Sequence, residues 1–340
     1  MKTTQVFFIL LILAFHAHGQ ETASDYMAKI GNEYREIQND TWAYIKAAAH
    51  GRNARKIDKR RLELTETIKK ANGTIRRFNT YQKDPSLRDA TVKYLSLSEI
   101  VIKEDYGKIV DMEKIAEESY DAMEAYLRAK KEAGEKLTAA HQELDSAQST
   151  FAAKHGINLI SKLDKQGEKI KKASEVMDYY NKVYLVFFKS YKQEGYVLQD
   201  LSNNDMGAFE QNKNTLNTFS TDGLLEIDNI GSYNGDPMIT TVGKKLLNFY
   251  QKEASEHFDT YSKTVLLKEK LEKMSKYLEA KKPSKRTQED IDKYNETLSE
   301  YNEQVNVYNK VNDTLNKQRT ELLKEWNDDS EKFMAKHVPK

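Results

Sequence analysis

Residues 291–333 read IDKYNETLSEYNEQVNVYNKVNDTLNKQRTELLKEWNDDSEKF, and this stretch decides the fold. Two series of residues recur in it at intervals of seven, the second set three positions after the first. The first series is Ile291, Leu298, Val305, Asn312, Arg319, Trp326 and Phe333, and the second is Tyr294, Tyr301, Tyr308, Leu315 and Leu322. Interleaved heptad series form the a and d seam of a coiled coil or a long bundle. The spacing therefore predicts one unbroken helix, about 65 Å long at the usual helical rise.

The seam also indicates what packs against this helix. Tyrosine is too wide for the seam of a tight two-stranded coil, and its hydroxyl needs a hydrogen-bond partner or water. We therefore expect several neighbouring helices rather than one identical strand. Asn312 and Arg319 interrupt the apolar seam, and such interruptions can fix the register of packed helices at a cost in stability.

Tyrosine–asparagine pairs recur along the same helix and are the candidate binding residues. They are Tyr294, Tyr301, Tyr308, Asn295, Asn302 and Asn309. Two interpretations remain open: the amides form a hydrogen-bonding ladder to a partner, or they are a polar flank beside a tyrosine-lined groove. Tyrosine combines a large contact area with a polar tip and is favoured at binding surfaces.

The start of the chain has the pattern of a secretory signal. Lys2 precedes an apolar run from Val6 to Phe15, and small residues follow at Ala17 and Gly19. Such a run is too short for a membrane span and fits the core of a cleavable signal peptide. We expect residues 1–19 to be removed, leaving an exported protein that is periplasmic, displayed on the cell surface or secreted.

Composition narrows the class of protein further. The chain has 54 basic and 53 acidic residues and no cysteine. The two signs are interleaved, whereas nucleic acids and anionic membranes select clustered positive charge. Disulfides and thiolate metal sites are excluded. We expect no nucleic-acid partner and, after signal cleavage, no integral membrane segment.

Prolines mark the expected boundaries of an all-α, elongated multi-helix bundle with long coiled-coil-like helices. The four prolines all lie where helices are expected to end or begin. Helices are expected at about 24–50, 55–81, 86–134, 135–155 and 238–280, besides the two heptad helices. Turn-forming dipeptides crowd residues 222–237. The expected organisation is an N-terminal bundle (20–221), a connector (222–237) and a helical hairpin (238–340), in one domain or two.

A second heptad helix contains the most apolar run after the signal. Ile170, Met177, Tyr184, Tyr191 and Leu198 stand seven apart. Residues 183–188 within it could insert into a membrane or could form a helix buried on several sides. Six residues are far fewer than the roughly 20 needed to cross a bilayer, which favours burial.

Catalytic and metal-binding patterns are sparse. The sequence contains no nucleophile elbow, Walker loop, dinucleotide fingerprint or His-Glu-x-x-His motif. Glu253 and His257 stand four apart on one helix face and are weak candidates for metal ligands. Further ligands for them are not evident, so we expect no cofactor and no metal site.

Parts of the second half resemble a known group of proteins. They are the turn Asn234-Gly235-Asp236-Pro237, the segment Leu246-Leu247-Asn248-Phe249-Tyr250, and Trp326 followed by Phe333, His337, Val338 and Pro339. Together with the signal peptide they resemble an uncharacterised family of exported, helical bacterial surface proteins. The resemblance implies export and a helical body, and it supplies no site residues.

The leading functional hypothesis is a non-enzymatic exported bundle that binds or scaffolds a protein or cell-envelope partner along its tyrosine-rich flank. A membrane-active or pore-forming helical protein is the first alternative, based on the run at 183–188. A metal- or small-ligand-binding bundle using Glu253 and His257 is the second. Oligomers are possible in each case.

Overall fold

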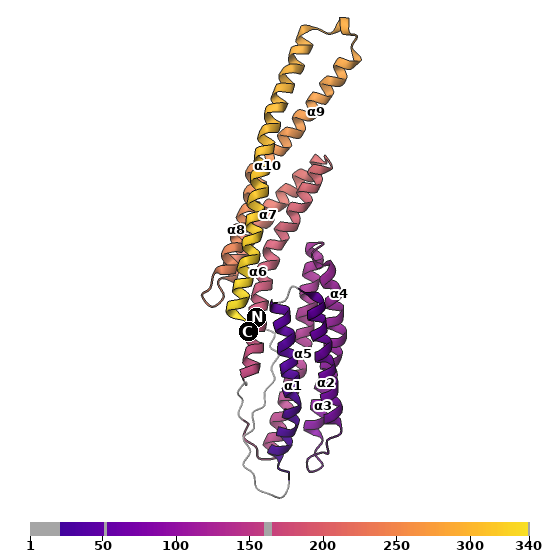
Figure 1. Cartoon of the computed structure of the whole chain (residues 1–340), viewed down its shortest axis with the longest axis vertical. Helices are drawn as coiled ribbons and strands as arrows, with labels where there is room; N and C mark the ends of the chain where they lie inside the picture. The colour runs from indigo at the N-terminus through magenta and orange to yellow at the C-terminus, as the bar shows by residue number, and fades with distance from the viewer. Residues whose placement is uncertain (1–20, 51–52, 160–164, 339–340) are drawn as a thin grey trace. The chain divides into compact units, whose positions relative to one another are not determined.

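The computed structural model describes residues 21–50, 53–159 and 165–338, and throughout these ranges the protein is an all-α multi-helix bundle (Figure 1). The expected signal peptide, residues 1–19, lies outside the described residues. The chain divides into two compact units, one comprising the described residues up to 181 together with 331–338, the other residues 182–330. We describe each unit separately.

The first unit is built mainly from five α-helices and one π-helical turn. They are α1 (Ala23–His50), α2 (Ala54–Arg76), α3 (Ser86–Ile100), η1 (Val101–Asp105), α4 (Tyr106–Ala116) and α5 (Tyr120–Lys154). One apolar face of each long helix fills the core, for example Tyr26 and Ile30 of α1, Ile75 of α2 and Leu144 of α5. Burying such faces is the main source of stability in a bundle of amphipathic helices.

The second unit takes up the chain within α6 (Lys165–Ser202). It continues through α7 (Met206–Ile230), α8 (Met238–Lys252), the π-helical turn η2 (Glu253–His257), α9 (Phe258–Ala280) and the short 3₁₀ turn η3 (Pro283–Lys285). The last helix, α10 (Gln288–His337), runs for 50 residues. The predicted unbroken helix over 291–333 is confirmed as part of α10.

Helix boundaries differ from expectation at three places. Asn53 begins α2 by accepting a hydrogen bond from the backbone N–H of Lys56, as expected for a capping side chain, but α2 ends at Arg76 rather than near residue 81. No helix break occurs at Gly134, which is buried inside α5. This helix begins instead at Tyr120, and the side chain of Ser119 caps its start. Residues 222–230, expected to be part of a connector, continue α7, so the turn occupies only 231–237.

The core of the second unit is closely packed around two helical glycines. A Cβ atom on Gly223 would lie 3.0 Å from Leu247, and one on Gly243 would lie 3.0 Å from Ile227. Trp326 packs here too, with its ring centroid 4.3 Å from that of Phe187. The apolar run at 183–188 contributes Val183, Val186, Phe187 and Phe188 to buried positions. Within the described residues, no helix is both long enough and apolar enough to cross a membrane.

The outer part of α9 and α10 forms a two-helix hairpin that extends beyond the ends of α6 and α7 (Figure 1). Its interior is partly polar, since Thr297 and Gln304 of α10 are buried. The amide of Gln304 donates to the backbone carbonyl of Thr260 at 3.2 Å. The heptad seam is most fully buried nearer the other helices, at Leu315, Trp326 and Phe333.

The order of elements repeats along the chain, a feature that the sequence analysis missed. Tyr81 and Asp84 form an isolated bridge before Pro85, and Tyr233 and Asp236 form the same bridge before Pro237, 152 residues later. A 15-residue helix follows each proline, and a five-residue π-helical turn follows each helix. Elements α1 to α5 therefore correspond in order to α6 to α10.

Matching ion pairs give the register of this repeat. Arg61 pairs with Asp58 in α2, and Lys213 pairs with Glu210 at the corresponding positions of α7. Lys93 pairs with Glu143 between α3 and α5, as Lys245 pairs with Glu325 between α8 and α10. Corresponding positions lie 152 residues apart before the α9–α10 turn and 182 apart after it, so the second hairpin is 30 residues longer than the first.

Candidate functional site

A buried group of three ionisable side chains lies where α10 meets α6 and η2. The Nε atom of Arg319 donates to Oε1 of Glu194 at 2.5 Å, and Nη2 of Arg319 donates to Oε1 of Glu253 at 2.5 Å. Glu253 is fully buried and Glu194 is 2% exposed. We call Glu194, Glu253 and Arg319 the charged trio.

Each member of the trio comes from a different element. Glu194 lies within α6, Glu253 opens η2, and Arg319 takes an a position in the heptad seam of α10. A π-helical turn inserts one extra residue into a helix, and such turns are frequent at functional sites. Arg319 also donates from Nη1 to the side-chain oxygen of Asn316 at 2.6 Å, which holds the guanidinium group along its own helix.

The trio holds two carboxyl groups against one guanidinium group, so their charges do not balance unless a proton is bound. Burial raises the pKa of Glu253 to about 10, and the neighbouring carboxylate of Glu194 adds to this shift, while Arg319 opposes it. Glu253 is therefore protonated at neutral pH. Burial disfavours the charge of Arg319, but the carboxyl groups of Glu194 and Glu253 outweigh it and raise the pKa of the arginine. One proton makes the trio neutral overall, as a buried site requires.

Tyrosine 250 borders the trio on the side of α8. Its side chain is fully buried, and burial together with the carboxyl groups of Glu194 and Glu253 raises the pKa of its phenol well above the ordinary value. Tyr250 is therefore a neutral phenol at any physiological pH. The surroundings of the trio thus combine neutral aromatic rings with a balanced set of charges.

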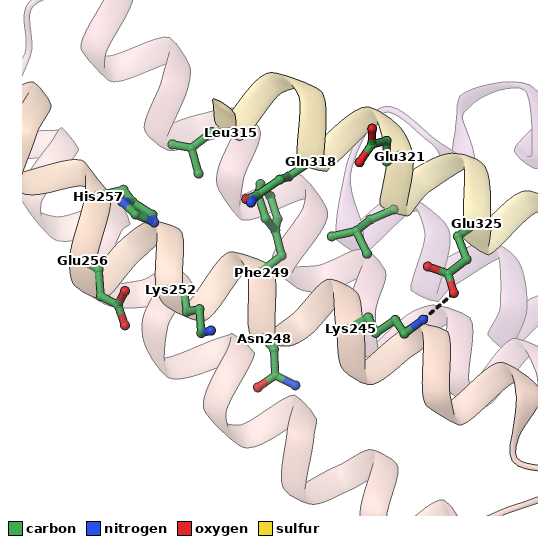
Figure 2. Close-up of a pocket in the computed structure, with 11 residues that line it drawn as sticks. Lys245, Asn248, Phe249, Lys252, Glu256, His257, Leu315, Gln318, Glu321 and Glu325 are labelled. Atoms are coloured by element: carbon green, nitrogen blue, oxygen red, sulfur yellow. Dashed lines mark hydrogen bonds and ion pairs between the residues drawn. The ribbon is translucent and has the colours of Figure 1, made fainter. Parts of the chain in front are cut away.

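A surface groove lies between α8, η2 and α10 (Figure 2). It has a volume of about 730 Å³ and is lined by Lys245, Asn248, Phe249, Lys252, Glu256, His257, Leu315, Gln318, Glu321, Leu322 and Glu325. The ion pair of Lys245 and Glu325 lies at one end, and Glu256 and His257 lie at the other.

Phe249 belongs to both the groove and the surroundings of the trio. It lines the groove, and the guanidinium carbon of Arg319 lies 5.6 Å from its ring centroid, as in a cation–π contact. The groove carries charges of both signs beside an aromatic ring and two leucines. Mixed chemistry of this kind suits a polypeptide surface better than a single small ion.

The weak metal candidates do not share a site in the structure. Glu253 turns into the trio, whereas His257 lines the groove at the far end of the same π-helical turn. Within residues 21–50, 53–159 and 165–338, no cluster of three or more histidine or acidic side chains could hold a metal ion.

The predicted binding residues separate into two groups. Tyr294, Tyr301 and Tyr308 are half-buried, and the ring centroid of Tyr308 lies 4.6 Å from that of Tyr261 in α9. Asn295, Asn302 and Asn309 are exposed. The tyrosines thus pack in the seam, and the asparagines form an exposed polar flank beside them.

Sequence reasoning identified Arg319 as an interruption of the seam and did not find its partners. Glu194 and Glu253 lie 125 and 66 residues away from it in sequence. Comparison with known proteins gives no further guide, because no family, curated protein or solved structure matches this chain.

Proposed function

We propose that this is an exported, non-enzymatic protein that binds or scaffolds a protein of the cell envelope or surface through the outer α9–α10 hairpin. The observation that carries the proposal is the hairpin itself. It is 30 residues longer than its counterpart between α4 and α5, although both belong to the same repeated arrangement of helices.

The outer hairpin contributes little to the core, which favours a role in binding. Its interior includes buried Thr297 and Gln304, and the hydroxyl of Thr297 contacts the sulfur of Met274 at 3.4 Å. Polar interiors of this kind stabilise a helix pair less than a close-packed apolar seam does. A long extension that adds little stability is explained if its outward face binds another molecule.

The outward face offers chemistry suited to a protein partner. Exposed amides at Asn295, Asn302 and Asn309 follow one flank at heptad spacing beside the half-exposed tyrosines. Amide groups both donate and accept hydrogen bonds, and tyrosine supplies contact area with little loss of side-chain entropy. The proposal of a non-catalytic role rests on the lack of any recognised catalytic motif in the sequence.

Site-specific photo-crosslinking in cells of the source organism tests the proposal. A photoreactive residue replaces Asn302 on the flank or, as the matched control, Glu303, which is exposed one position later. We expect a protein adduct of one defined mass from position 302, lost when Asn295 and Asn309 are also changed to alanine. No adduct at 302, or equal adducts at both positions, would refute binding through this flank.

Export has its own test. N-terminal sequencing of the protein recovered from its native cells should find Gln20 as the first residue, because the proposed signal ends at Gly19. Recovery of the intact N-terminus from the cytoplasm would contradict the proposed export and leave the hairpin proposal to its own experiment.

A further inference from the structure

One side of the outer α9–α10 hairpin carries three large apolar side chains that are open to solvent. They are Leu266 and Tyr277 of α9 and Val307 of α10, which are 61%, 53% and 49% exposed. Lys270 and Glu300 mark this side, because their side chains meet across the hairpin with Nζ and Oε2 3.6 Å apart. Leu266 and Tyr277 share a helix face with Lys270, and Val307 shares one with Glu300, since residues four and seven apart lie on the same face. We call this the ion-pair side of the hairpin.

Charges on the ion-pair side are separated by helix. Two sets of four residues follow the same spacing of four, three and four positions, which places each set on one helix face. In α9 the two central residues of the set are basic, and in α10 the first three residues of the set are acidic. All of them are exposed. The α9 set is Leu266, Lys270, Lys273 and Tyr277, and the α10 set is Glu296, Glu300, Glu303 and Val307.

The outer hairpin is also incomplete as a packed unit. It extends beyond α6 and α7, so its two helices cover only each other there (Figure 1). Their shared interior is partly polar, since Thr297 and Gln304 are buried in it. Antiparallel helices of this length commonly pack as bundles of four around one core. A second hairpin on the ion-pair side would complete such a bundle.

We infer that the ion-pair side is a dimer interface, covered by the same side of a second copy of this chain. A two-fold axis parallel to the helices sets α9 of each copy against α10 of the other. Each basic face then meets an acidic face, and the exposed apolar side chains are covered. Such an interface is self-complementary, as a two-fold dimer requires. An axis across the helices would instead set α9 against α9, with like charges facing each other.

Positions along the hairpin agree with this arrangement. Lys270 and Glu300 lie level within one copy, so an axis parallel to the helices also sets Lys270 of one copy level with Glu300 of the other. By the same count, Tyr277 of one copy comes level with Lys293 of the other. Lys293 is a basic residue on the acidic α10 face, and an ammonium group placed over a tyrosine ring is favourable. The dimer therefore gives this exceptional charge a suitable neighbour.

The dimer goes beyond the proposed function and leaves the asparagine flank free. Asn302 follows Glu300 by two positions, which is more than half a helical turn, so the flank faces away from the ion-pair side. Position 303 lies on the ion-pair side, and a photo-adduct there should have the mass of two copies of the chain. An adduct at 302 should contain a different protein. The two proposals therefore fail separately.

Charge reversal in the full chain, followed by sedimentation velocity, tests the dimer. The native chain should sediment with twice the mass of one chain at about 10–100 μM. Lys270→Glu/Lys273→Glu reverses the α9 face, and Glu300→Lys/Glu303→Lys reverses the α10 face. Each variant alone should raise the dissociation constant of the dimer roughly ten-fold or more, because like charges then face each other across the interface.

Mixing the two reversed variants is the decisive step. In a mixed dimer, α9 of each copy again meets an α10 of opposite charge, so an equal mixture should recover the native dimer content. A native chain that stays monomeric over this range would overturn the inference. A mixture that stays monomeric, or reversed variants that each dimerise like the native chain, would overturn it too.

Two further variants control for position and folding. Glu272→Lys/Glu279→Lys reverses two exposed charges on the other side of α9 and should leave the dissociation constant unchanged. If charge reversal reduces the helical circular dichroism, Leu266→Gln/Val307→Gln takes its place, because it removes apolar contacts and keeps every charge. An unchanged dissociation constant in this last variant would also contradict the dimer. Either reversed variant alone provides a single copy for distance measurements within α10.

Discussion

Replacing Arg319 alone should be among the most damaging single changes in the second unit. The substitution Arg319→Leu removes the partner of two buried carboxyl groups, both 2.5 Å from the guanidinium nitrogens. Breaking a buried ion pair from one side costs about 3–5 kcal/mol, because a buried charge is left uncompensated. The control is Lys245→Leu, which breaks an ion pair whose side chains are 50% and 36% exposed. Exposed pairs contribute about 0–1 kcal/mol.

Tryptophan fluorescence can show which of the two units is destabilised by Arg319→Leu. The chain has two tryptophans, Trp42 in the first unit and Trp326 in the second, where it packs against Phe187. In a Trp42→Phe background, urea unfolding followed by tryptophan emission reports the second unit alone. This precaution is needed because two units with separate cores need not unfold in one transition.

The pH dependence of the same variant tests the cause of the loss. Without Arg319, the two buried carboxyl groups have no positively charged partner, and burial favours the protonated form of a carboxyl group in the folded state. The folded state then binds protons that the unfolded state has released, so stability falls as pH rises. We expect the loss caused by Arg319→Leu to be larger at pH 8 than at pH 5. A loss of stability no greater than that of Lys245→Leu, at either pH, would show that Arg319 does not compensate buried carboxyl groups.

Three further experiments test other features of the protein. The folded state holds the Glu253 proton up to about pH 10, so the free energy of unfolding should fall between pH 5.5 and pH 8.5. It should fall less in the variant Glu253→Gln. Urea midpoints measured across this range compare the two proteins. Gly223→Ala should lower the free energy of unfolding by about 1–3 kcal/mol through overpacking. Gly195→Ala adds a carbon with no atom within 4 Å, so it should raise the free energy of unfolding by about 0.5–1 kcal/mol. Thermal melts of the two variants compare these effects. Hydrogen bonds from Lys154 and Ser86 hold the pKa of Asp84 far below its usual value. Asp84→Asn should therefore lower the free energy of unfolding by about 1–3 kcal/mol at pH 6. The loss should be smaller at pH 3, and urea unfolding at both pH values measures it.

The fold class and the last helix followed from the sequence because both depend on local periodicity. Seam positions at heptad spacing predicted α10, and the burial of Leu315, Trp326 and Phe333 agrees with that seam. The buried Thr297 and Gln304 were missed, since α9 packs against a third position of the seam in these two heptads. Polar residues at these places give no signal in a pattern of apolar residues.

The repeat could have been found from the sequence and was not. Tyr-x-x-Asp-Pro occurs at 81–85 and again at 233–237, each time before a predicted helix. Different side chains at most other corresponding positions hide the relation, and the hairpin extension changes the spacing from 152 to 182 residues. The partners of Arg319 were beyond sequence reasoning, because only the packing of three helices brings Glu194 and Glu253 to it.

Both the exposed flank and the charged trio depend on α10 being one straight helix. Spin labels on cysteines at Asp292 and Asp328, both exposed and both within the second unit, measure this directly by pulsed electron spin resonance. The positions are 36 residues, or ten helical turns, apart and share one face, so an unbroken helix separates them by about 54 Å. We expect one narrow distance distribution near this value in the full chain. A broad distribution, or a mean shorter by about 10 Å or more, would show that α10 is broken.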